Sequence, residues 1–99
     1  MDLRVSLIKM LQRLMDDMLV LHQQGAGYYS CVPLARRYNK LLSQAETLVT
    51  DSNGLMATFE EQVEHDPKDP SEKMKVVQGL RIEIGQLVSL LESLEETSD

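Results

Sequence analysis

The spacing of apolar residues toward the C-terminal end of the chain restricts its fold more than any other feature. Apolar residues recur there at alternating steps of three and four, which is the period of one face of an α-helix. They are Val77, Leu80, Ile84, Leu87, Leu91 and Leu94. Asp69 is a favourable N-cap residue and Pro70 a favourable first helical residue. The sequence therefore predicts a helix from Pro70 to about Glu96.

The first segment of the chain carries a second apolar stripe with the same period. Its members are Leu3, Leu7, Leu11, Leu14, Met18 and Leu21. Ile8, Met15 and Leu19 widen this stripe on one side, and Met10 and Val20 lie near its other edge, so the helix can contact two neighbours rather than one. Gly25 is a natural helix stop. We therefore expect a helix over residues 2–24.

A third stripe follows the glycine-rich turn at residues 25–30. Its members are Leu34, Tyr38, Leu41, Ala45 and Leu48. Ser30 can cap this helix, and Pro33 fits its first turn because a missing N–H costs nothing there. There is no strand pattern of comparable length, so all three segments predict an all-α protein.

The second helix meets five weak helix formers at residues 50–54. Their helical conformation would cost about 3 kcal/mol relative to alanine. We therefore expect a break, followed by a short helix from Leu55 to Glu64. The alternative is one long helix bent within this stretch, because Leu55 and Phe59 keep the register of Leu48.

Size and charge limit the class of protein. The 99 residues suffice for one domain, residues 1–99, and the formal net charge of −6 makes nucleic acid and anionic membranes poor partners. Charged residues interrupt the apolar N-terminal segment, which argues against a signal peptide and a membrane span. The single cysteine, Cys31, excludes an intramolecular disulfide. We therefore expect a cytoplasmic protein.

The arrangement of the helices can also be predicted. Short connections make sequential helices antiparallel neighbours, so the start of the second helix would lie near the end of the last. Arg36 and Arg37 would then pair with Glu92, Glu95 and Glu96, within one chain or across a dimer. Each apolar face is wider than a single seam. The sequence thus predicts an antiparallel helical bundle of three main helices with a short extra helix, completed as a homodimer.

The turn before the second helix carries one candidate site. Tyr28 and Tyr29 followed by Arg36 and Arg37 combine stacking with anion-binding groups beside a helix N-terminus. The alternative is that both tyrosines cover the end of the bundle and both arginines pair with glutamates. We favour this alternative, and keep the four residues as candidate ligand or partner contacts.

The last helix carries a second candidate surface. Gly85, Ser89 and Ser93 recur every four residues on one face, where small side chains allow another backbone to approach closely. This face is either a partner groove or dimer contact, or simply a face turned toward solvent. The sequence does not favour one over the other.

Catalytic and metal signals are weak. His22 and Cys31 flank the first turn and could form a thiolate pair, but a helix-end histidine and a buried small hydrophobe are the favoured interpretation. Glu61, Glu64 and His65 belong to an acidic cluster, yet a di-metal site in a bundle needs two such sets. Solvated charge is therefore expected, with no metal, no cofactor and no catalytic residue.

Two functions remain after this reading. The favoured one is a non-enzymatic protein–protein interaction module, such as an adaptor, a small regulatory subunit or a chaperone-like helical bundle, binding itself or another helical protein. The alternative is a small-molecule or metal-binding helical module. It would use the end formed by Tyr28, Tyr29, Arg36 and Arg37, or the cluster of Glu61, Glu64 and His65.

Overall fold

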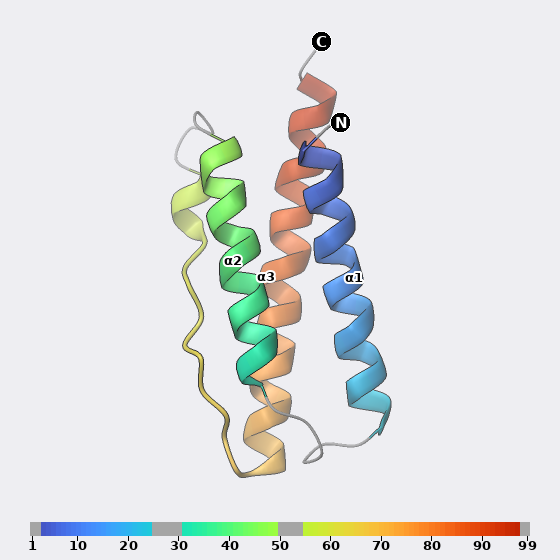
Figure 1. The fold of residues 1–99 in the computed structure, drawn as a ribbon, viewed down its shortest axis with the longest axis vertical. Coiled ribbons are helices and arrows are strands. Elements are labelled where there is room, and N and C mark those ends of the chain that lie inside the picture. Colours follow the sequence, from blue (N-terminus) through green and yellow to red (C-terminus); the bar gives the residue numbers. More distant parts are fainter. Residues whose placement is uncertain (1–2, 25–30, 50–54, 98–99) are drawn as a thin grey trace.

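The computed structural model describes residues 3–24, 31–49 and 55–97 and contains three long helices (Figure 1). Their bounds are Leu3–Gln24 for α1, Val32–Leu48 for α2 and Pro70–Thr97 for α3. A 3₁₀ turn, η1, spans Leu55–Thr58. Over the described residues the fold is all-α, since helices are its regular elements and no strand occurs, and its three α-helices pack against one another as predicted.

The break after the second helix is confirmed, but the short helix that was expected to follow it is wrong. Helix α2 ends at Leu48, and Val49 has extended backbone angles (φ −103°, ψ 92°), which excludes one continuous helix. Residues 50–54 lie outside the described residues. Only Leu55–Thr58 coil beyond them, and residues 59–69 continue without helix. Here we call residues 59–69 the strap.

The strap changes the direction of the last helix. Figure 1 shows α1 running opposite to α2 and α3, while α2 and α3 run parallel to each other. An extended chain of 11 residues reaches about 36 Å, whereas the 17 residues of α2 rise only about 26 Å. The strap can therefore return along the whole of α2, and the expectation that α3 lies antiparallel to α2 is wrong.

A second expectation fails for the same reason. The start of α2, which carries Arg36 and Arg37, lies at the opposite end of the bundle from the end of α3 (Figure 1). Within one chain, these arginines therefore do not meet the C-terminal glutamates. Arg36 instead pairs with Glu64 of the strap, with 2.8 Å between Nε and Oε1.

The core is aliphatic apart from one tyrosine and forms along the three predicted stripes. Its fully buried large side chains are Leu11, Met18, Tyr38, Leu42, Leu80, Ile84, Leu87 and Leu91. Helix α1 packs against both α2 and α3, and the α2–α3 contact is smaller. Phe59 of the strap and Met56 of η1 cover the edge of this core. The strap is thus attached to the bundle through apolar contacts as well as polar ones.

The start of α3 follows the predicted capping chemistry. The Asp69 carboxylate accepts hydrogen bonds from the backbone N–H and the hydroxyl of Ser71, each at 2.9 Å. These bonds lower the pKa of the Asp69 carboxyl, because they favour its charged form. Helix α2 begins differently, because its N-cap residue is Cys31 and the Cys31 side chain makes no capping hydrogen bond.

None of the helices in the described part of the chain combines the length and the apolar character that crossing a bilayer requires.

Candidate functional site

An open apolar hollow of about 400 Å³ lies between the first half of α1 and the last half of α2. Its walls are Leu3, Ser6, Leu7 and Met10 of α1 and Leu41, Gln44, Thr47 and Leu48 of α2. Leu3 is 68% exposed, Met10 47% and Leu48 38%. Large apolar side chains therefore face solvent from both walls of this hollow.

A second hollow of about 460 Å³ continues along the same two helices. Its walls are Lys9, Met10, Arg13, Leu14 and Asp17 of α1 and Pro33, Leu34 and Arg37 of α2. Met10 belongs to both hollows, so they are adjacent parts of one depression, which we call the α1–α2 groove. From Leu3 to Asp17 its α1 wall rises about 21 Å.

The two halves of the α1–α2 groove differ in charge. The half nearer the start of α2 is lined by Lys9, Arg13 and Arg37, and Arg36 and Lys40 border a small hollow beside it. These five residues are half of the ten basic residues in a chain of net charge −6. A positive region of this size on an acidic protein is a local exception that favours negatively charged partners.

Among the described residues, acidic groups pair with two of these five basic residues, and one of these pairs joins Arg36 to Glu64 of the strap. Asp17 pairs with Arg13, with 3.1 Å between Oδ1 and Nε, and both side chains are more than half exposed, so the pair is weak. Among the described residues, no carboxylate lies within salt-bridge distance of Lys9, Arg37 or Lys40. The cationic half of the groove is thus available to charges from outside.

The strap explains why the α1–α2 groove is open and the α2–α3 side is not. It contacts α2 through Arg36 and Asn39 and contacts α3 through Lys73. Phe59 lies beside Ser89 and Leu90 of α3 around a small hollow. The chain therefore uses its own extended segment to cover one side of α2, and has no described segment over the other.

One side chain of α2 holds the middle of the strap. The Asn39 side-chain amide donates to the Gln62 carbonyl at 2.7 Å and accepts from the Gln62 backbone N–H at 2.7 Å. The amide thus pairs with both main-chain groups of one residue, as a neighbouring strand would. Together with the pair between Arg36 and Glu64, it fixes the strap on α2.

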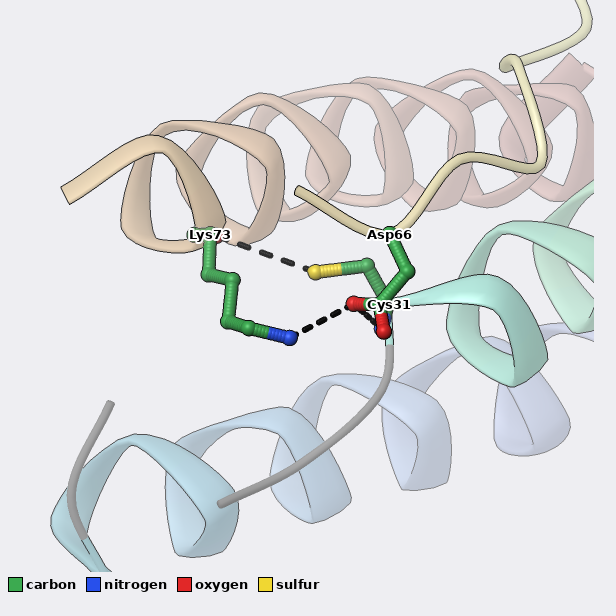
Figure 2. Close-up of polar contacts among 3 residues, drawn as sticks. All are labelled: Cys31, Asp66 and Lys73. Atoms are coloured by element: carbon green, nitrogen blue, oxygen red, sulfur yellow. Dashed lines mark hydrogen bonds and ion pairs between the residues drawn. The ribbon is translucent and has the colours of Figure 1, made fainter. Parts of the chain in front are cut away.

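The end of the strap joins the first turns of α2 and α3 (Figure 2). One oxygen of Asp66 accepts the backbone N–H of Cys31 at 3.1 Å and lies 2.6 Å from the Lys73 ammonium. Lys73 is 8% exposed and Asp66 is 38% exposed. The carboxylate therefore offsets a nearly buried charge and satisfies a backbone donor at the start of α2.

Cys31 is suited to packing rather than to chemistry. Its side chain is fully buried, and its thiol lies 4.0 Å from the Lys73 carbonyl oxygen (Figure 2). Burial raises the pKa of the Cys31 thiol, with Lys73 acting in the opposite direction. A thiol with a raised pKa is a poor nucleophile. The favoured reading as a small buried hydrophobe is confirmed, while the side chain of His22 lies outside the described residues.

The candidate site at the first turn is only partly described. Tyr28 and Tyr29 lie outside the described residues. Arg36 and Arg37 are both exposed on α2. Arg36 pairs with a glutamate of the strap, and Arg37 lines the α1–α2 groove. Arg37 thus belongs to the cationic half of a groove that the sequence did not reveal, whereas Arg36 holds the strap.

The predicted small-residue face of α3, formed by Gly85, Ser89 and Ser93, is partly exposed and partly engaged within the chain. Gly85 is half-exposed, and Ser89 and Ser93 are exposed. Ser89 borders the hollow beside η1, and the Ser93 hydroxyl donates to the Leu90 carbonyl at 2.8 Å. A Cβ added at Gly85 would meet nothing within 4 Å. No backbone of the described residues occupies the space beside this glycine.

The acidic cluster does not form the predicted helical face. Glu61, Glu64 and His65 are exposed on the strap, where residues four apart are separated by about 13 Å along the extended chain rather than by one helical turn. Glu64 is engaged with Arg36. In the described parts of the chain, no three His, Cys, Asp or Glu side chains come close enough together to hold a metal ion.

Sequence reasoning missed two groups of residues. Asn39, a weak helix former in the middle of a helix, was a signal that its side chain has a partner. Lys9 and Arg13, like Arg36 and Lys40, lie four residues apart and so share a helical face. That spacing, in an acidic chain, was enough to indicate a basic surface.

No protein-family model, curated protein or solved structure matches this chain. Its function is therefore inferred from its own residues.

Proposed function

We propose that this protein is a non-enzymatic protein–protein interaction module that docks a helical segment in the α1–α2 groove. One observation carries the proposal: Leu3, Met10 and Leu48 stay exposed on facing walls of one groove, while the neighbouring members of the same stripes are buried. Clustered apolar surface of this kind marks binding sites, whereas single exposed apolar residues are ordinary.

The shape of the groove supports a helix as the bound element. Two antiparallel helices present a long depression between them, and a helix laid into it would complete a four-helix arrangement. Complete burial of one large apolar side chain contributes about 1.5–3 kcal/mol. The three side chains are already partly covered, so together they would supply several kcal/mol, enough to select this groove.

The described chemistry favours binding over catalysis. The Cys31 thiol is buried with a raised pKa, and the Lys73 ammonium beside it is paired with Asp66. The alternative function, a small-molecule or metal-binding module, has no specific observation in its favour. Its two tyrosines lie outside the described residues, and its acidic cluster is spread along the strap.

A selection from displayed amphipathic helices would test the proposal. The immobilised full chain is offered a library of helical peptides with a varied apolar face, and the dissociation constants of enriched peptides are measured. We expect Met10→Glu with Leu48→Glu to weaken binding by at least about tenfold, because a carboxylate would be buried under each peptide. The matched control is Ile82→Glu, at an apolar residue of α3 that is 66% exposed and lies outside the groove.

The outcomes separate clearly. Enriched peptides that lose binding to the groove variant but not to the control support the proposal. Enrichment that neither change affects, or that the Ile82 variant abolishes, would overturn it. Circular dichroism melting of each variant shows that the bundle remains folded, which is expected because all three positions are exposed.

A further inference from the structure

We infer that the partner of the α1–α2 groove is an acidic amphipathic helix of another protein. Its apolar residues would cover the half between Leu3 and Leu48, and its aspartates or glutamates would face Lys9, Arg13 and Arg37. This inference rests on the proposed function, since it names the partner of the same groove.

Charge complementarity is the first argument. The groove is lined by three basic residues and one acidic residue, and that residue, Asp17, is already paired with Arg13. Lys40 extends the positive surface beside it, while Arg36 is paired with Glu64 of the strap. The remainder of the chain is acidic, since the net charge is −6 despite this concentration of cations. A basic helix would meet repulsion here, whereas an acidic helix would be attracted.

The order of the apolar and cationic halves of the groove predicts the sequence pattern of the bound helix. The apolar half covers Leu3 to Met10 on α1, which is about two helical turns, and the cationic half covers about two more. A helix that fills the groove would therefore have about 14 residues. Apolar anchors spaced by three and four would occupy one end, and acidic residues on the same face would occupy the other.

A second copy of this chain fits the groove less well. The apolar stripe of α3 is buried in its own core at Leu87 and Leu91, so the acidic end of that helix has no free stripe to offer there. The other acidic cluster of the chain lies on the strap, which is not helical. Two copies also bring together two net charges of −6. A separate protein is therefore the better occupant, and a second copy is an outcome that the test can reveal.

Three synthetic peptides of about 15 residues test the partner chemistry. They share one apolar face and differ only in the half that would meet the cations, which carries glutamate, glutamine or lysine. Binding to the full chain is followed by fluorescence anisotropy. We expect the glutamate peptide to bind about tenfold more tightly than the glutamine peptide, because several exposed ion pairs each add a small contribution. The lysine peptide should bind more weakly than both, and added salt should reduce the differences.

Charge reversal in the protein tests the same ion pairs from the other side. Arg13→Glu with Arg37→Glu should remove the preference for the glutamate peptide and favour the lysine peptide. Arg81→Glu, at an exposed arginine of α3 outside the groove, is the control and should leave the order unchanged. Thermal melting of each variant checks that these exposed substitutions preserve the fold.

Each failure has a distinct meaning. Equal binding of the glutamate and glutamine peptides, lost in Met10→Glu with Leu48→Glu, would overturn the inference and leave the proposed function intact. Failure of all three peptides, together with failure of the helix selection, would overturn the proposed function itself. A dimer in solution that the groove variant converts to monomer would identify a second copy as the occupant and also overturn the inference.

Discussion

The attachment of the strap can be tested by a single substitution, Asn39→Ala. The change removes two hydrogen bonds, each of 2.7 Å, between the side-chain amide and the main chain of Gln62. A typical hydrogen bond contributes about 1 kcal/mol to the free energy of unfolding, so the two together contribute about 2 kcal/mol. Alanine restores roughly 0.6 kcal/mol through its higher helix propensity. The expected net loss is therefore about 1–2 kcal/mol.

Two measurements check this value. Urea denaturation gives the change in the free energy of unfolding, and native-state hydrogen exchange reports whether the Gln62 amide opens more readily. The amide should exchange faster, because Asn39 supplies its hydrogen-bond acceptor. Ser43→Ala, at an exposed position of the same helix, is the matched control. It gains helix propensity without losing a bond to the strap, so it should be neutral or slightly stabilising.

The conservative variant Asn39→Asp adds a finer test. Aspartate keeps an acceptor for the Gln62 N–H but places a carboxylate against the Gln62 carbonyl oxygen. It should therefore destabilise the protein while protecting the Gln62 amide better than alanine does. If Asn39→Ala were as stable as Ser43→Ala, with unchanged exchange at Gln62, the strap would not be held in the way described.

Three further predictions concern the core and the helices. Leu42→Ala should lower the free energy of unfolding by about 2–5 kcal/mol, because the Leu42 side chain is fully buried. Leu48→Ala should lower it much less, because Leu48 is 38% exposed. Equal losses in urea titrations would contradict this packing. Gly85→Ala should raise stability by up to about 1 kcal/mol, since its Cβ meets nothing within 4 Å, and a loss would show that another backbone packs there. Burial, and next the nearby Glu83 carboxylate, raise the pKa of the Tyr38 hydroxyl. Folding thus favours the neutral hydroxyl. The stabilisation that Tyr38 provides is therefore complete below the pKa of an unfolded tyrosine, about 10, and is lost as the pH rises above that value. The unfolding free energy of Tyr38→Phe should therefore fall less than that of the wild type between pH 9 and 11, and parallel curves would refute this assignment.

The helices could be predicted because their signals are local. Leucines at steps of three and four indicate a helix whatever the rest of the chain does. Asp69 and Pro70 define the start of α3 because they act on the backbone of its first turn. The break after Leu48 was predictable for the same reason, since five weak helix formers follow one another.

The strap could not be predicted from the same kind of signal. Glutamates at Glu60 and Glu64 match a helical period as well as they match an extended segment. What decides between the two is the set of partners on other elements, namely Asn39 for the main chain of Gln62 and Lys73 for Asp66. These partners are 7 to 23 residues away along the chain, so the choice depends on the tertiary arrangement.

The α1–α2 groove was missed because it depends on the direction of α3. The sequence indicated apolar faces too wide for one seam, but short connections suggested that sequential helices alternate in direction. Once the strap returns along α2, it covers the α2–α3 side and leaves the other side open. The residues that line the groove were visible in the sequence, while their juxtaposition was not.

The positions of the first and last helices show that the helical packing can exist without the strap. The first turn of α1 and the last turn of α3 lie at the same end of the bundle (Figure 1). A short linker between them would allow the chain to be opened within the strap as a circular permutant. Its helices would then follow in the order α3, α1, α2, and every pair of successive helices would be antiparallel. The long return segment is therefore a consequence of the order in which the helices follow one another, and the helical packing itself does not require it.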